Sequence, residues 1–244
     1  MTGPRVMNAV GAELSKLRTL PVATLTAVGT AVVGALIATA LTAQLVDQGA
    51  PASGITVTIQ AVPFVQTGLI LLGVLPVTHE YAGAQLRTSL AAVPRRGLLL
   101  AGKSVATLLG LTLAAALTVG GVVAATALTG SLLDAPPVEG VVDPWPVVGA
   151  VAYLVLVGLL AHAVALLVRH LVPALAGTLS LVLIVSPLLG GLTRHARWLP
   201  DRAAMQLYDP TDAVLSAATG ALVMLAWIAL IGGTAAMLFV RRDP

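Results

Sequence analysis

The feature of the sequence that most constrains its fold is a set of six long stretches without Asp, Glu, Lys or Arg. Each stretch is rich in Ala, Leu, Val and Gly, and each offers the roughly 20 apolar residues that a helix needs to cross a ~30 Å hydrocarbon core. Over the whole chain 58% of residues are hydrophobic and 9% are charged, too few charges for one compact soluble domain. The sequence therefore predicts an integral membrane protein.

Unbroken apolar runs favour helices over the alternating strands of a membrane barrel. We expect an all-α membrane protein with six transmembrane helices in a single domain, residues 1–244. The first stretch has an alternative interpretation as a cleaved signal peptide, although it is longer than the ~7–15-residue apolar core of such peptides. The expected spans are residues 21–46, 57–78, 104–130, 146–168, 171–192 and 214–240.

The basic residues divide unevenly between the two sides of these spans. If both termini are cytoplasmic, ten Lys and Arg lie inside and only Arg194, Arg197 and Arg202 lie outside. Cytoplasmic loops carry the excess of Lys and Arg, so we expect cytoplasmic termini in a plasma or inner membrane. The net charge of +3 then reflects orientation rather than nucleic-acid binding. The absence of Cys excludes disulfides, thiol catalysis and Cys-based metal sites.

The N-terminal segment has an amphipathic pattern. Met7, Val10, Leu14 and Leu17 recur at helical spacing, with polar residues over the remaining surface. This pattern predicts a helix that lies along the cytoplasmic face of the membrane. It would serve as an anchor on anionic lipid, as a docking surface for a partner, or as both.

The longest cytoplasmic loop, residues 79–97, carries a second amphipathic pattern. Leu86 and Leu90 share one helical face, and Pro94 ends the helix. Basic residues follow, and we expect Lys103 to extend to the lipid headgroups at the start of the third span. A large cytoplasmic partner would meet the chain mainly here and at the N-terminal helix.

The segment before the last span, residues 186–212, contains the pairs Ser-Pro and Gly-Gly inside an apolar region. Non-helical backbone at membrane depth requires shelter from protein or from a water-lined cavity. The sequence leaves two alternatives open: the segment re-enters the membrane from outside, or it forms a plain surface loop.

Two motif matches suggest catalytic or nucleotide sites, and both fail on context. Residues 97–104, GLLLAGKS, match a phosphate-binding loop, but they follow a basic cluster and lead directly into a span, so we expect helix there. His79-Glu80 begins a zinc-protease motif, yet Gly83 stands where the second His is needed. We expect no enzyme activity and no cofactor or metal bound by this chain.

Polar residues within the spans are sparse. Gln66, Thr67 and His162 are candidates for a translocation path, although a neutral His hydrogen-bonded to a neighbouring helix is the commoner situation. A secondary transporter would normally show charged residues in several spans, and a membrane-embedded enzyme would need acids, bases or metal ligands at one depth. The sparse, neutral set suits an apolar or amphipathic cargo better.

Small residues repeat every four positions along the first span, at Thr30, Gly34, Ala38 and Thr42. Such rows let helices approach closely. Spacing alone does not distinguish packing within the chain from a subunit interface.

The two amphipathic segments resemble parts of the membrane subunit of type-2 ATP-binding-cassette (ABC) exporters, a permease family with six spans. Residues 12–18, AELSKLR, are similar to the family's interface helix, with Glu13, Lys16 and Leu17 as the matching positions. Residues 80–96 resemble the family's most specific signature, in which a coupling helix rests on the ATPase; Ala84 departs from the Thr of many relatives. The residues that the resemblance assigns to ATPase coupling are Glu80, Tyr81, Gly83, Arg87, Leu90, Pro94, Arg95 and Arg96.

The resemblance covers nearly the whole chain as topology but only about a sixth of it at the level of residues. It implies a homodimer or heterodimer of permeases on two separate ATPase chains, which bind ATP and Mg. It also implies export of an amphipathic, peptide, antibiotic or lipid-like substrate, without naming the cargo. The alternative is a membrane-embedded enzyme or a secondary transporter without an ATPase partner.

Overall fold

The computed structural model describes residues 10–16, 19–82, 96–137, 143–212 and 214–241. These residues form helices and connecting turns, with no strand among them, which confirms the expected all-α fold. The side chains of Glu80, Tyr81 and Arg96 are outside this description. Also outside the described residues lie the predicted site residues Leu17, Gly83, Arg87, Leu90, Pro94 and Arg95.

Six helical segments are long and apolar enough to cross a membrane, as the charge-free stretches predict. The protein is therefore a multi-pass membrane protein. Five segments are single α-helices, and the fifth in chain order consists of α7 and α8 joined by a π-helical turn, η1. The bounds are α2 Pro21–Asp47, α3 Gly54–Ala82, α5 Arg96–Leu132, α6 Trp145–Val168, α7 Leu171–Ser180, η1 Leu181–Val185, α8 Ser186–Leu192 and α10 Ala217–Arg241.

Helix ends differ from the expected span ends where the expectation rested on charge. The third span was expected to begin at residue 104, but α5 already begins at Arg96. Charge keeps a residue out of the hydrocarbon core without keeping it out of a helix. Side-chain caps mark two other starts: the Ser53 hydroxyl accepts from the Thr56 N–H at 3.0 Å, and the Ser216 hydroxyl accepts from the Thr219 N–H at 3.2 Å.

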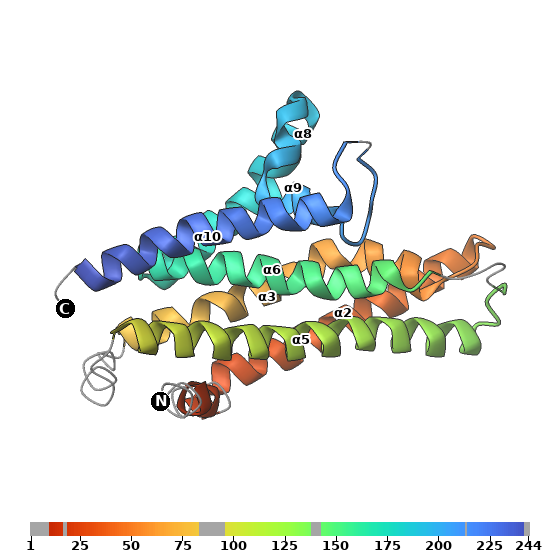
Figure 1. Cartoon of the computed structure of the whole chain (residues 1–244). Coiled ribbons are helices and arrows are strands. Elements are labelled where there is room, and N and C mark those ends of the chain that lie inside the picture. Colours follow the sequence, from red (N-terminus) through yellow and green to blue (C-terminus); the bar gives the residue numbers. More distant parts are fainter. Residues whose placement is uncertain (1–9, 17–18, 83–95, 138–142, 213, 242–244) are drawn as a thin grey trace.

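The helices are arranged around a central pair, α3 and α6, which pack on each other more extensively than any other two (Figure 1). In the most apolar stretch of α3 and of α6, 72% and 61% of the residues are buried within the chain. In the other four spans the buried share is only 11–33%. Residues 10–16 and the end of α10 lie at the same end of the bundle, which we call the terminal end (Figure 1). We call the opposite end, with the connection between α2 and α3, the distal end.

Glycines let the central helices touch backbone to backbone. A Cβ at Gly73 in α3 would collide with the carbonyl oxygen of Gly158 in α6, and a Cβ at Gly158 would lie 2.6 Å from Leu111 in α5. The row of small residues predicted along α2 faces the interior of the bundle. Gly34, Ala38 and Thr42 of this row are buried, and Gly34 packs on Val65 of α3. This row therefore packs within the chain.

The π-helical turn η1 lets the fifth span continue through Pro187 as a helix. The Ser186 N–H donates to the carbonyl of Leu181, five residues back, and Pro187 follows at the start of α8. A π-turn widens the helix, which makes room for a proline ring that would otherwise collide with the preceding turn. The helix thus continues through Pro187 to Leu192.

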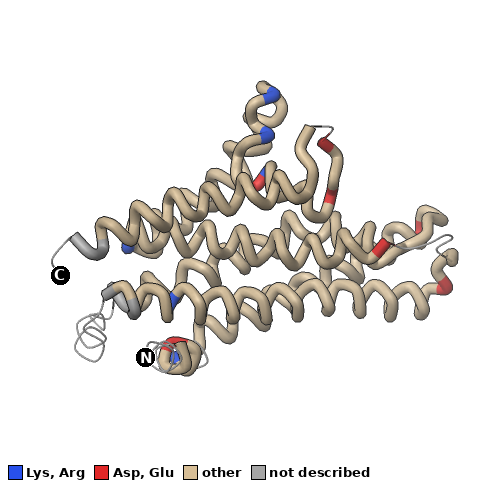
Figure 2. The backbone as a smooth tube through the Cα atoms, viewed as in Figure 1, with Lys and Arg blue, Asp and Glu red and all other residues tan. Residues whose placement is uncertain are grey.

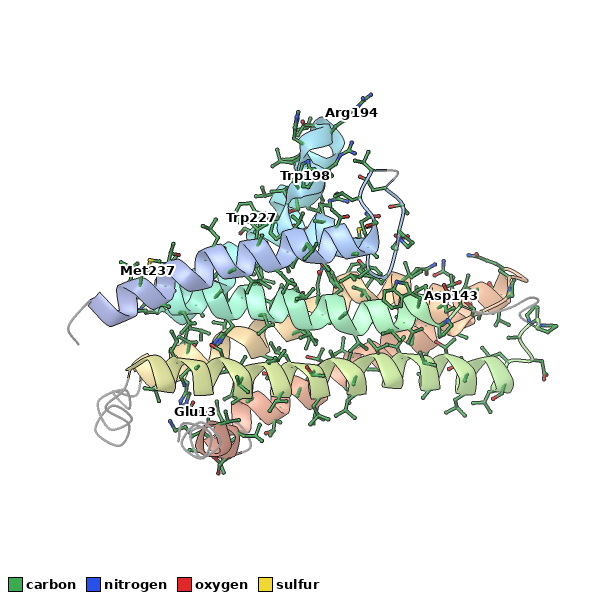
Figure 3. The ribbon with its side chains drawn as sticks, in the orientation of Figure 1. Glu13, Asp143, Arg194, Trp198, Trp227 and Met237 are labelled. Carbon is green, nitrogen blue, oxygen red and sulfur yellow. The ribbon has the colours of Figure 1, made fainter. Side chains whose placement is uncertain are left out.

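The chain then returns to the bundle through two short helices, η2 (Arg194–Trp198) and α9 (Pro200–Met205). We call residues 193–212 the return segment. Its helix α9 contacts α6 and α10, whereas η2 contacts α8 and α9. The indole N–H of Trp227 donates to the Trp198 carbonyl at 3.0 Å, and Trp227 lies near the middle of the candidate span Ala217–Leu238 (Figure 3). The re-entrant arrangement stays a prediction.

Charged residues are confined to the two ends of the bundle and to the return segment, while the long helical middles are uncharged (Figure 2). Lys and Arg predominate near the terminal end, and Asp predominates at the distal end of the described chain (Figure 2). The structure thus keeps the separation of charge that the sequence displays.

Candidate functional site

A polar cluster joins four helical segments near the terminal end. Its side chains are Glu13, Lys103, Ser104 and His162, which come from the N-terminal helix (described over residues 10–16), α5 and α6. Backbone carbonyls of α3 complete it. We refer to these four side chains as the polar cluster.

The first half of the polar cluster is an ion pair. Lys103 Nζ lies 2.8 Å from Glu13 Oε2, and the two side chains are 8% and 7% exposed. Lys103 also donates to the Pro76 carbonyl of α3 at 3.3 Å, while Lys16 binds the other Glu13 oxygen at 2.6 Å. The pair therefore fixes the N-terminal helix to both α3 and α5.

Lys103 thus differs from its expected role as a snorkelling anchor. Its ammonium points inward because Glu13 supplies a carboxylate there, and a buried lysine is stable only with such a partner. Residues 97–104 are α-helical throughout, so their N–H groups do not form the open loop of a phosphate site.

The second half of the polar cluster connects α5 to the central pair. His162 is 3% exposed; its Nδ1 lies 3.3 Å from the Gly73 carbonyl, and its Nε2 lies 3.3 Å from the Ser104 hydroxyl. A carbonyl only accepts, so Nδ1 carries the proton and donates, and a neutral imidazole then accepts the Ser104 hydroxyl at Nε2. The Gly73 carbonyl is reachable because α3 and α6 approach so closely here.

An apolar groove of about 470 Å³ opens beside the polar cluster. It lies between the N-terminal helix, α2, α3 and α5, with Leu14 and Pro76 among its walls. Thr107 in α5 also lines it, and the Thr107 hydroxyl is buried without a hydrogen-bond partner among the described residues. The groove places an unused polar group within an apolar wall.

A second polar contact lies further along the central pair. The Tyr153 hydroxyl of α6 donates to Gln66 Oε1 of α3 at 2.6 Å, and Gln66 Nε2 donates to the Pro63 carbonyl at 3.0 Å. The ring of Tyr208, from the return segment, meets Tyr153 edge to face at 4.9 Å. The return segment is therefore held against α6 well inside the span.

The three residues predicted for a translocation path separate into two groups. Gln66 and His162 are buried and hydrogen-bonded between α3 and α6, whereas Thr67 is half-buried beside Gln66. Within this single chain, Gln66 and His162 connect helices. A path formed with a second subunit stays a prediction.

Glu13 is the predicted residue whose role the structure extends most. The resemblance assigned it to an interface helix, and the structure adds Lys103 as its partner. A weak signal was present in the sequence, because Glu13 lies three residues after Val10 and next to Leu14, at the edge of the apolar face of its helix. An acid at such an edge becomes buried when the face packs, and it then needs a basic partner.

Polar contacts also hold the return segment in place. The Ser186 hydroxyl donates to Asp201 Oδ1 at 2.6 Å, and burial raises the pKa of the Asp201 carboxyl above its ordinary value despite that hydrogen bond. Asp212 accepts from the N–H of Val214 at 2.7 Å, and these backbone bonds lower its pKa.

Among the described residues, no group of three or more His, Asp or Glu side chains could hold a metal ion. The sequence matches no model of a known protein family, and no curated protein sequence matches it. The functional argument therefore rests on the chain itself.

Proposed function

We propose that the chain is the membrane-spanning permease subunit of an ATP-driven ABC exporter. In this proposal both termini are cytoplasmic, and the chain works in a plasma or inner membrane with a second permease subunit, the same or homologous. A separate ATPase subunit binds ATP and Mg. The exported substrate is amphipathic, peptide, antibiotic or lipid-like.

The observation that carries the proposal is the attachment of the N-terminal helix to the spans through the polar cluster. Lys103 joins Glu13 of that helix to the Pro76 carbonyl of α3. The helices α3 and α5 are the two that the proposed coupling segment connects along the chain. A force applied by a partner to the terminal end would therefore reach both helices through buried bonds.

The central pair provides the rigid body that such a force would move. Gly73 and Gly158 bring α3 and α6 into backbone contact, and His162 bonds across them. Tightly packed helices shift as units between discrete arrangements rather than deforming continuously. ATP-driven closure of the partner would thus rock α3 and α6 together.

The exposed apolar faces of the outer helices are consistent with lipid and a second subunit as neighbours. Only 17% of the residues in the most apolar stretch of α2, and 11% of those in the most apolar stretch of α10, are buried within the chain. Faces of this kind are stable in a bilayer or against another apolar helix, but not in water.

Affinity purification in mild detergent tests the partnership. The tagged chain should co-elute with an ATPase subunit, and the two reconstituted in vesicles should export cargo on ATP addition. Glu80→Gln should assemble and hydrolyse ATP normally but lose export, whereas Asp134→Asn, at the distal end, should export like the unaltered chain. Export driven by a proton or sodium gradient without the ATPase would instead support a secondary transporter.

A further inference from the structure

The return segment contains a feature that the proposed function leaves unused. Arg194, Arg197 and Arg202, predicted from the sequence as the only basic residues on their side of the membrane, line one pocket of about 310 Å³. Thr193, Gln206, Thr211 and Asp212 supply further polar walls. We call this the arginine pocket.

The lining of the arginine pocket holds more basic than acidic side chains. Asp212 is the one acid among its lining residues, and its carboxylate lies 3.4 Å from Arg197. Arg202 donates to the carbonyls of Ser186 and Pro187 at 3.4 and 3.5 Å, which are long bonds, and it also interacts electrostatically with the buried Asp201 carboxyl. Among the lining residues, three guanidinium groups thus face one carboxylate.

One end of η2 lies against a candidate span. The Trp198 carbonyl, at the end of η2, is bonded to Trp227 near the middle of that span, whereas Arg194, at the start of η2, lies at the outer tip (Figure 3). Arginine at membrane depth is stable in a water-filled cavity or beside a counter-charge. An anion in the arginine pocket would supply such a counter-charge.

We propose that the arginine pocket binds a phosphate group. Guanidinium groups donate in planar pairs that match the geometry of phosphate oxygens, and each phosphate oxygen can accept more than one such bond. Gly190 leaves the space for the Arg202 head, because a Cβ there would lie 2.6 Å from Arg202 Nη2. The phosphate comes either from the headgroup of an anionic lipid or from a soluble phosphate compound.

The proposal is independent of the proposed function, because binding to the purified chain needs neither an ATPase nor transport. Native mass spectrometry in neutral detergent should show phosphatidylglycerol bound in preference to phosphatidylcholine, and inorganic phosphate should compete. Arg194→Gln with Arg202→Gln should weaken binding by about tenfold for each guanidinium removed. The matched control, Arg241→Gln with Arg242→Gln, removes the same charge from the C-terminal tail and should bind like the unaltered chain.

Each outcome decides the matter. Lipid binding lost only in the pocket variant assigns the site to a headgroup. Saturable binding of inorganic phosphate, lost in the same variant without any lipid preference, assigns it to a soluble phosphate. Absence of both, or equal loss in the control, overturns the proposal. If the double variant unfolds early, the single variant Arg194→Gln replaces it, because the Arg194 side chain is exposed. Unchanged phosphate or lipid affinity in a folded Arg194→Gln chain would also overturn the proposal.

Discussion

The polar cluster and the arginine pocket place basic side chains at two parts of one membrane protein in opposite ways. In the polar cluster, Lys103 meets Glu13 at 2.8 Å and both are closed off. The lining of the arginine pocket holds three arginines and one carboxylate, and Arg197 lies 3.4 Å from that carboxylate with side chains 23% and 22% exposed. Charge neutralised within the chain holds helices together, whereas charge left over is available to a ligand.

Breaking the polar cluster should have the largest effect. Glu13→Gln leaves the Lys103 ammonium buried without its carboxylate, so the free energy of unfolding should fall by about 3–5 kcal/mol. Lys16→Gln removes only an exposed partner of Glu13 and should cost less than about 1 kcal/mol. Thermal and denaturant unfolding in detergent measure both.

A double variant sharpens this test. Glu13→Gln with Lys103→Gln removes both charges, so it should be more stable than Glu13→Gln alone. If the two substitutions simply add, the ion pair described here does not hold the N-terminal helix.

Separating the central helices should have the next largest effect. Gly73→Ala places a methyl group against the Gly158 carbonyl, so α3 and α6 must move apart, at a cost of about 1–3 kcal/mol. Gly120→Ala, where a Cβ meets no atom within 4 Å, should instead be neutral or stabilising by up to about 1 kcal/mol. Unfolding measurements that rank the two variants the other way would contradict the close approach.

The return segment should respond to pH through Asp201. Its raised pKa means that the folded state holds the proton more tightly than the unfolded state. Stability should therefore fall as pH rises from the ordinary carboxyl value of 3.8 toward the raised one. Asp201→Asn keeps an acceptor for Ser186 and should remove this slope in unfolding curves recorded across that window; a slope that persists would show that another group titrates.

The smallest expected effect concerns the one acid of the arginine pocket. Asp212→Asn removes its carboxylate, so affinity for phosphatidylglycerol should rise by up to about fivefold. Asp209→Asn, outside the pocket lining, should leave affinity unchanged. Weaker binding in Asp212→Asn would mean that Asp212 orients Arg197 rather than opposing the anion.

The sequence predicts those features that depend on local pattern. Long stretches without charge predict all six spans, and the four-residue row from Thr30 to Thr42 marks a face that packs closely. Helix ends were less predictable, because the rule that excludes Lys103 from lipid does not exclude it from α5.

Contacts between distant segments could not be read from local pattern. Glu13 and Lys103 lie 90 residues apart, and only the position of Glu13 at the edge of an apolar face indicated a buried partner. The convergence of Arg194 and Arg202 depends on the turn between η2 and α9, where Leu199 is extended, so no single helix presents both. Pairings of this kind arise from the tertiary fold.

The π-helical turn at Leu181–Val185 makes the number of residues in the fifth span important for the direction in which the following chain points. Each residue added to or removed from a helix rotates everything after it by about 100°. A chain one residue shorter here could form an ordinary α-turn, yet Ser186 would leave the face on which it meets Asp201. Substitutions within this turn should consequently be tolerated more readily than insertions or deletions, since the count of residues, more than their identity, aims the return segment.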